Sequence, residues 1–317
     1  MTLSKAFVRG LCVGVVAMFA MGCASHGPPR RSRGLWTGPG DSLETYIRKV
    51  RTLSKAARRP RPEASTLETH DPEIKEALKA LAVAANAPAH RRVAEAYRQA
   101  GILDAAYNHY AAALVFDKGD AASYDGLARV WRDWGFPELG VGDARRAIFY
   151  APNSAAAYNT FGTLLQAVGL RSEAERAFER ALALDPRAAY ALTNLCYLSF
   201  QRADIESALA SCRRAIALEP GLAAAHNDLG LVYAADGDLA SAATEFAAAG
   251  GDAGRQYNLG IVLSASRRYS EAAAAFDAAQ MLRPDWISAA EWARQSRRRA
   301  RQLGSTSTGA SNSHVRP

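Results

Sequence analysis

Catalytic motifs are missing from this 317-residue sequence. It contains no glycine-rich phosphate-binding loop and no Gly-x-Ser-x-Gly elbow. Its six histidines are scattered without the spacing of metal ligands, and none stands near a pair of cysteines. Because a reaction needs several groups that converge on one point, the sequence predicts no catalytic residue, no metal site and no cofactor. It therefore argues against an enzyme.

The N-terminal apolar run, residues 11–20, is too short to cross a bilayer comfortably. It follows two basic residues and ends close to Cys23, so residues 1–22 are predicted to be a signal peptide. This end resembles a bacterial lipobox, in which the cysteine is lipidated and becomes the mature N-terminus, although Ala20 stands where leucine is usual. We expect a lipid anchor at Cys23. An ordinary secretory cleavage nearby is the alternative. If the anchor holds, Ala24 resembles the signal for outer-membrane sorting.

The dominant feature of the sequence is a unit of about 34 residues that is repeated six times, and residues 155–188 show it clearly. In this unit a first helix is expected to stop at Gly169, which supplies a left-handed residue. A second helix is expected over 172–184, with Ser172 and Glu175 forming a capping box at its start. Each unit is therefore predicted to be a helical hairpin.

Small and large residues recur in register through the six units. The first helices carry a column of small residues, which is Ala94, Ala128, Gly162, Cys196, Gly230 and Gly260, and the second helices carry a column of aromatic residues, which is Tyr110, Phe178, Phe246 and Phe276. This spacing resembles the tetratricopeptide repeat over about 87–286. The resemblance implies an all-α, right-handed α-solenoid of about six helix-turn-helix repeats with capping helices at both ends.

Departures from the repeat concentrate at a few positions. Ala144 and Cys212 replace the aromatic residue, Cys196 occupies the small column, and four residues are missing near Gly250-Gly251. Cys196 and Cys212 fall on the two helices of one hairpin, in columns that face inward. Two alternatives stay open for them: a disulfide, which an oxidising compartment permits, and two buried free thiols.

The predicted organisation follows from the repeat and its flanks. It consists of a signal peptide (1–22), a disordered tether (23–40), a basic amphipathic helix with its linker (41–70), an N-capping helix (71–86), six repeats (87–120, 121–154, 155–188, 189–222, 223–252, 253–286), a C-capping helix (287–303) and a disordered tail (304–317). Residues 62–286 carry 21 basic and 28 acidic residues, so the positive charge of the chain lies in its flanks. This distribution argues against a nucleic-acid partner.

The helix expected at 41–59 has two faces. Leu43, Tyr46, Ile47, Val50 and Leu53 share the apolar one, and the other carries Arg48, Lys49, Arg51, Lys55, Arg58 and Arg59. Such a helix can lie on anionic lipid or dock on the solenoid with its charges in water. The sequence leaves both open.

In tetratricopeptide proteins the first helices line the concave surface, so their outward positions predict a peptide groove. The residues predicted to line it are Arg91, Arg98, Arg129, Arg132, Asn159, Thr163, Gln166, Asn194, Tyr197, Phe200, Asn227, Tyr257 and Asn258. The four arginines outnumber Glu95 and Asp125 on the same stripe, so we expect a positive surplus at the N-terminal end. The groove suits a peptide with acidic groups at one end and apolar side chains at the other.

The sequence thus predicts a non-enzymatic adaptor of the cell envelope, anchored by lipid and facing the periplasm, which binds a protein or peptide. Two alternatives remain. One is a cytoplasmic regulatory or chaperone-type protein, and the other is a noncatalytic subunit of an envelope enzyme.

Overall fold

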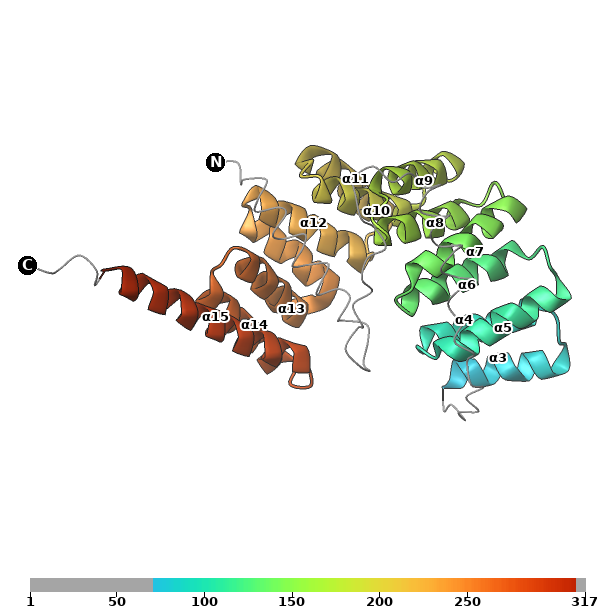
Figure 1. Cartoon of the computed structure of the whole chain (residues 1–317), viewed down its shortest axis with the longest axis horizontal. Helices are drawn as coiled ribbons and strands as arrows, with labels where there is room; N and C mark the ends of the chain where they lie inside the picture. The colour runs from blue at the N-terminus through green and yellow to red at the C-terminus, as the bar shows by residue number, and fades with distance from the viewer. Residues whose placement is uncertain (1–70, 312–317) are drawn as a thin grey trace, which may run out of the picture. The chain divides into compact units, whose positions relative to one another are not determined.

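The computed structural model describes residues 71–311, and this part of the chain contains helices and no strand (Figure 1). The helices are α3 (Pro72–Val83), α4 (Ala87–Gln99), α5 (Leu103–Phe116), α6 (Ala121–Asp133), α7 (Pro137–Tyr150), α8 (Ala155–Ala167), α9 (Arg171–Leu184), α10 (Ala189–Gln201), α11 (Ile205–Leu218), α12 (Ala223–Asp236), α13 (Leu239–Ala265), α14 (Tyr269–Leu282) and α15 (Ile287–Ser311). The predicted signal peptide, tether and basic helix lie outside the described residues. The all-α fold predicted from the sequence is confirmed.

The described chain divides into two compact units, residues 71–191 and residues 192–311, with the boundary inside α10. Within each unit consecutive helices pack as antiparallel neighbours, as Figure 1 shows for α4 and α5 and for α12 and α13. No helix among the described residues is long and apolar enough to be a candidate membrane span.

The turns inside the hairpins share one geometry. After α8, Gly169 adopts a left-handed φ of 87°, its N–H donates to the Gln166 carbonyl at 3.0 Å, and the Leu170 N–H donates to the Leu165 carbonyl at 2.8 Å. This pair of bonds is a Schellman motif, which satisfies the last carbonyl groups of the helix. Gly101, Gly135 and Gly237 end their helices in the same left-handed conformation.

The capping box predicted at Ser172 is wrong. Helix α9 begins at Arg171, its N-cap residue is Leu170, and no side chain caps it. Leu170 is buried. Because the Schellman turn places this leucine in the core directly after Gly169, the helix starts before the serine can serve as its cap.

Glycine–phenylalanine contacts hold the two helices of a hairpin together. A Cβ atom added to Gly162 would lie 2.5 Å from the Phe178 ring, and one added to Gly230 would lie 2.4 Å from Phe246. The same relation joins Gly260 and Phe276 at 2.7 Å. The small column therefore exists because an aromatic ring of the partner helix lies directly against it.

One hairpin replaces this contact with a covalent bond. Cys196 on α10 occupies the glycine column and Cys212 on α11 occupies the aromatic column. The two side chains are fully buried and form a disulfide, with Cα atoms 5.3 Å apart. Both departures from the repeat thus meet at one point, where two small side chains joined by sulfur fill the space of one ring.

The four missing residues shorten the exit from the fifth hairpin. Helix α13 runs from Leu239 to Ala265 across a kink, where Gly250 (φ −146°, ψ 15°) and Gly251 (φ 66°, ψ −167°) leave the helical conformation. Only glycine adopts the second of these conformations readily. Gly250 and Gly251 therefore replace the longer turn that separates the other repeats.

The two ends of the array behave differently from each other. Asp71 caps α3, because its carboxylate accepts hydrogen bonds from the backbone N–H groups of Glu73 and Ile74. At the other end α15 continues to Ser311, past Leu303, where the disordered tail was predicted to begin. That prediction is wrong for residues 304–311, because extending an existing helix needs no apolar face.

Candidate functional site

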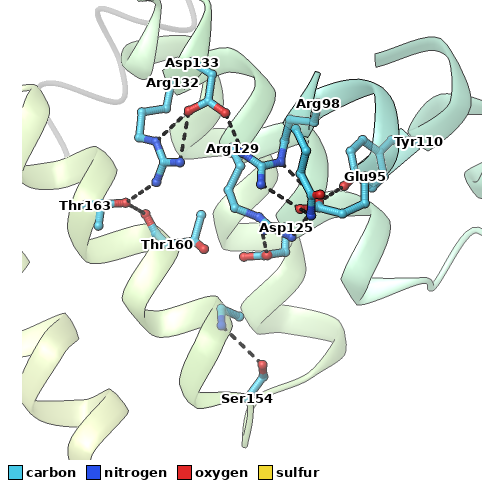
Figure 2. A network of polar contacts seen from close by, with 12 residues as sticks. Glu95, Arg98, Tyr110, Asp125, Arg129, Arg132, Asp133, Ser154, Thr160 and Thr163 are labelled. Atoms are coloured by element: carbon cyan, nitrogen blue, oxygen red, sulfur yellow. Dashed lines mark hydrogen bonds and ion pairs between the residues drawn. The ribbon is translucent and has the colours of Figure 1, made fainter. Parts of the chain in front are cut away.

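The first helices of the 71–191 unit, α4, α6 and α8, carry a wall of polar side chains (Figure 2). The wall contains the predicted groove residues Arg91, Arg98, Arg129, Arg132, Asn159, Thr163 and Gln166, all of them partly exposed. Figure 2 shows that the side chains of Arg98, Arg129 and Arg132 point toward acidic or hydroxyl groups of the same wall. The arginines are therefore engaged within the protein.

Glu95 is the centre of the network. Its carboxylate accepts two hydrogen bonds from the Arg98 guanidinium, at 2.7 and 3.1 Å, and one from the Tyr110 hydroxyl at 2.7 Å. Arg129 lies 3.7 Å from the same carboxylate. Burial alone raises the pKa of Glu95, but these hydrogen bonds and charges outweigh it and lower the pKa to about 2.

Arg129 also joins Asp125, one turn earlier on α6. The Arg129 Nε and a carboxylate oxygen of Asp125 are 3.1 Å apart. The second carboxylate oxygen of Asp125 is buried without a hydrogen-bond partner. Burial raises the pKa of this carboxyl group, against the positive charge of Arg129. Keeping the Asp125 carboxylate ionised in the wall therefore costs folding free energy.

Arg132 carries the network on to α8. It bonds to Asp133 at 3.0 Å and reaches Thr163 at 3.4 Å. The Thr163 hydroxyl in turn donates to the Thr160 carbonyl at 2.8 Å. Asp133 also accepts from Arg98 at 2.8 Å and so links α4 to α6.

The predicted positive surplus does not exist. Arg91 donates to Asp120 at 2.8 Å, and Asp133 holds both Arg98 and Arg132. With Glu95 and Asp125 the four arginines thus face four carboxylates, and the wall is neutral. The sequence prediction missed Asp120 and Asp133 because they precede and end helix α6, outside the i, i+4, i+7 stripe. Their signal was an acid at each end of α6, within reach of Arg91 and Arg98 on the first helix of the preceding repeat.

In the 192–311 unit the same positions are largely buried. Phe200, predicted to line the groove, is 1% exposed and belongs to the core. Leu231, Ala234, Ile261 and Ser264 are buried too. The predicted groove positions lie at the border of the core. The long side chains of arginine and glutamine reach water from there, whereas short or apolar side chains stay inside the core. The assignment of Phe200 to the groove is wrong for this reason.

The other predicted groove residues of this unit contact neighbours in the chain. The Asn258 side-chain amide donates to Asn227 at 2.8 Å. Tyr257 stacks on Trp286 with ring centroids 4.4 Å apart. Tyr197 packs against the core, 6.4 Å from the Phe200 ring, and Asn194 is partly buried. The Asn258–Asn227 bond joins α13 to α12.

Two histidine contacts occupy equivalent places in different repeats. The Nδ1 atoms of His90 and His109 are 3.0 Å apart, and burial together with the charge of His90 lowers the pKa of His109 to about 4. Burial also lowers the pKa of His226, but its bonds to Glu245 (2.6 Å) and to the Pro220 carbonyl raise the pKa above the usual value. Within the described residues no group of three or more His, Cys, Asp or Glu side chains could hold a metal ion.

Comparison with known proteins agrees with this architecture. Residues 155–187 match the tetratricopeptide repeat family model. Residues 155–187 are thus a tetratricopeptide repeat, and the other hairpins repeat its arrangement. No curated protein sequence matches it.

Several solved structures share the tetratricopeptide-repeat fold. A tetratricopeptide repeat protein of Parabacteroides merdae is 16% identical, with a TM-score of 0.55 over 80% of this chain and 98% of that one. Pseudomonas aeruginosa pilF is 18% identical, with a TM-score of 0.51 over 70% and 99%. The APC/C hetero-tetramer Cut9–Hcn1 is 15% identical, with a TM-score of 0.59 over 80% of this chain and 49% of that one. At these identities the likeness concerns the fold.

Proposed function

We propose that this tetratricopeptide-repeat protein is a non-enzymatic adaptor of the bacterial cell envelope, anchored at Cys23, which binds a protein or peptide on the polar wall of α4, α6 and α8. Repeat solenoids present extended surfaces of this kind to other proteins. The observation that carries the proposal is the wall itself: its side chains are partly exposed, fixed by ion pairs and neutral in sum.

A neutral, preorganised wall favours a partner with polar backbone groups over one with a strong charge. Thr163 and Gln166 extend from α8 beside the arginines and offer hydroxyl and amide groups. Because the arginines are held by Asp and Glu, a ligand finds their remaining N–H groups already oriented. An extended peptide chain, with alternating N–H and C=O groups, matches this surface.

Photo-crosslinking from intact envelopes tests the binding surface. A photoreactive residue at Gln166 should capture a protein partner, and one at Arg176, exposed on the second helix α9 of the same hairpin, should not. Equal capture from both positions, or capture from Arg176 alone, would contradict the wall as the binding surface.

The anchor is supported by the apolar run that ends at Cys23, and the buried disulfide of the 192–311 unit is of a kind that forms in oxidising compartments. Mass spectrometry should find a diacylglyceryl-cysteine at the mature N-terminus, and Cys23→Ala should release the protein into the soluble fraction. An unmodified N-terminus at Ala24, or a retained Met1, would contradict the proposed lipid anchor at Cys23.

A further inference from the structure

Large apolar side chains are exposed at one edge of the 71–191 unit, in the last turns of α3, α5 and α7. They are Val83 (89% exposed), Val115 (79%), Phe116 (56%), Phe149 (77%) and Tyr150 (46%), which we call the apolar edge. Isolated exposed apolar residues are ordinary, but a gathering of this kind marks an interaction surface.

Contacts join the members on α5 and α7 into one surface. A Cβ atom added to Gly119, in the turn that follows Phe116, would lie 3.5 Å from the Tyr150 ring. Tyr150 therefore covers this turn, and the Phe149 ring lies 5.0 Å from Tyr150. On the other side the Phe116 ring lies 5.4 Å from His90 in the first half of α4. The edge is thus continuous from the start of α4 to the end of α7.

We propose that residues 41–59 of the same chain dock on the apolar edge. These residues lie outside the described part of the chain, and their sequence predicts a helix with five apolar side chains on one face, from Leu43 to Leu53. Such a face is about 15 Å long at 1.5 Å per residue. Packed helices lie about 8–10 Å apart, so the face reaches across the ends of two of them.

The linker is long enough for the segment to return to this edge. Eleven residues, 60–70, separate it from Asp71, and an extended chain of that length spans up to about 36 Å. Helix α3 has 12 residues, which corresponds to about 18 Å. The segment can therefore run back along α3 to Val83. Pro60 and Pro62 interrupt any helix that would otherwise continue into the linker, so the chain can reverse its direction there.

Docking removes two exposed apolar surfaces from water in a single contact. Insertion of the segment into a bilayer would bury its own apolar face and leave Phe116 and Phe149 exposed. The basic face of the segment stays in water when the apolar face is docked, because the two faces lie on opposite sides of the helix.

Amine crosslinking gives a direct test, because the chain has six lysines and Lys118 is the only one after Lys79. Lys118 lies in the turn beside Phe116. We would crosslink the purified full chain as an equal mixture of isotopically light and heavy protein. The expected products join Lys49 or Lys55 to Lys118 within one molecule, light to light and heavy to heavy.

A matched pair of variants separates docking from chance proximity. Phe116→Ser with Phe149→Ser should lower the yield of these crosslinks by about tenfold or more, because two apolar contacts are lost. Met281→Ser with Ile287→Ser removes side chains that are 77% and 71% exposed in the other unit and should leave the yield unchanged. All four side chains are exposed, so far-ultraviolet circular dichroism should show unchanged helix content.

Three results would overturn the proposal. The first is an undiminished yield in the Phe116→Ser, Phe149→Ser variant. The second is crosslinks of which about half join light to heavy molecules, the share that random pairing of two copies gives, which would assign the edge to a second copy. The third is the absence of Lys118 crosslinks together with binding of the segment to vesicles of anionic phospholipid, which would assign residues 41–59 to the membrane. None of these results depends on the partner of the polar wall.

Discussion

Equivalent positions of the two units hold different chemistry. On the first helices of residues 71–191, Arg98, Arg132 and Gln166 extend from the border of the core into water, and the arginines pair with acids. In residues 192–311 the same column holds Phe200 and Ala234, which are buried. One unit therefore keeps a polar wall at a place where the other extends its core.

The contact between the two helices of a hairpin also varies, because one hairpin of the 192–311 unit holds a disulfide while two others keep the glycine–phenylalanine contact. Gly162 packs against Phe178 without a covalent bond, whereas Cys196 and Cys212 make a disulfide at the equivalent place. The backbone of the repeat is thus common to both units, whereas the side chains at equivalent positions stabilise it by ion pairs, by apolar packing or by a disulfide.

The largest effect is expected from the disulfide. Cys196→Ser, or a reducing agent acting on the wild type, should destabilise the 192–311 unit by about 2–5 kcal/mol, because the unfolded chain loses a constraint. Urea unfolding would measure the loss of stability, and hydrogen exchange would show in which unit the loss occurs. Residues 71–191 contain no cysteine and should exchange as before. A protein that unfolds identically with and without reductant would contradict the role of the bond.

The glycine contact comes next. Gly162→Leu forces a side chain against the Phe178 ring, where even a Cβ atom would lie 2.5 Å away, and should cost about 1–3 kcal/mol. Gly142 on α7 is the control, because a Cβ atom there meets nothing within 4 Å. Gly142→Ala should raise stability by about 0.5–1 kcal/mol. Thermal unfolding that does not distinguish the two variants would mean that the repeat register is wrong.

Glu95→Gln tests the polar wall. The change removes a carboxylate that holds Arg98, Arg129 and Tyr110, and we expect a loss of about 1–3 kcal/mol at neutral pH. The folded pKa of about 2 lies below the ordinary 4.5. Its contribution is therefore complete above about pH 4.5 and is lost as the pH falls toward 2.

The variant should accordingly flatten the acid limb of the stability curve, measured by denaturant unfolding between these pH values. The control is Glu76→Gln, whose carboxylate pairs with Lys79 at 3.8 Å on the exposed face of α3; its effect should stay within about 0.5 kcal/mol. A Glu95 variant that behaves like this control would show that the wall is not stabilised by its charges.

At Asp228 the dependence on pH is expected to have the opposite sign. Burial raises the pKa of this α12 carboxyl group from 3.8 to about 8, so the folded 192–311 unit binds the proton more tightly than the unfolded chain. Its stability should fall as the pH rises from about 4 through 8. Asp228→Asn should remove this dependence, and it should stabilise the protein more at pH 8 than at pH 4. An equal effect of the substitution at pH 4 and pH 8 would exclude the titration.

The helical hairpins could be predicted because their signals are local. Gly169 predicts a left-handed turn by itself, and the 34-residue register brings the glycine and phenylalanine columns together without any coordinates. The capping box failed because a buried Leu170 competes with Ser172 for the start of the helix. That competition depends on packing, which a local pattern does not contain.

The site was harder to predict because it depends on distances between helices. The stripe rule found the arginines and missed Asp120 and Asp133, which approach them from the ends of α6. It also placed Phe200 in the groove, because Phe200 stands at the same position of its helix as Arg98. At this position, on the border of the core, an arginine side chain reaches water and a phenylalanine side chain is buried. The repeat pattern placed Cys196 and Cys212 on one hairpin, but the 5.3 Å between their Cα atoms depends on how its two helices pack.

The contrast between charge in one unit and a covalent bond in the other has one direct test. Hydrogen exchange resolved by residue should be recorded at pH 7 and near pH 3, each with and without a reducing agent that acts at that pH. We predict that acid lowers the protection factors, which correct for the pH dependence of intrinsic exchange, chiefly in residues 71–191, where the stabilising contribution of Glu95 decreases below pH 4.5, and that the reductant lowers them in residues 192–311 alone. Acceleration by the reductant in residues 71–191, or acid labilisation confined to residues 192–311, would contradict the account.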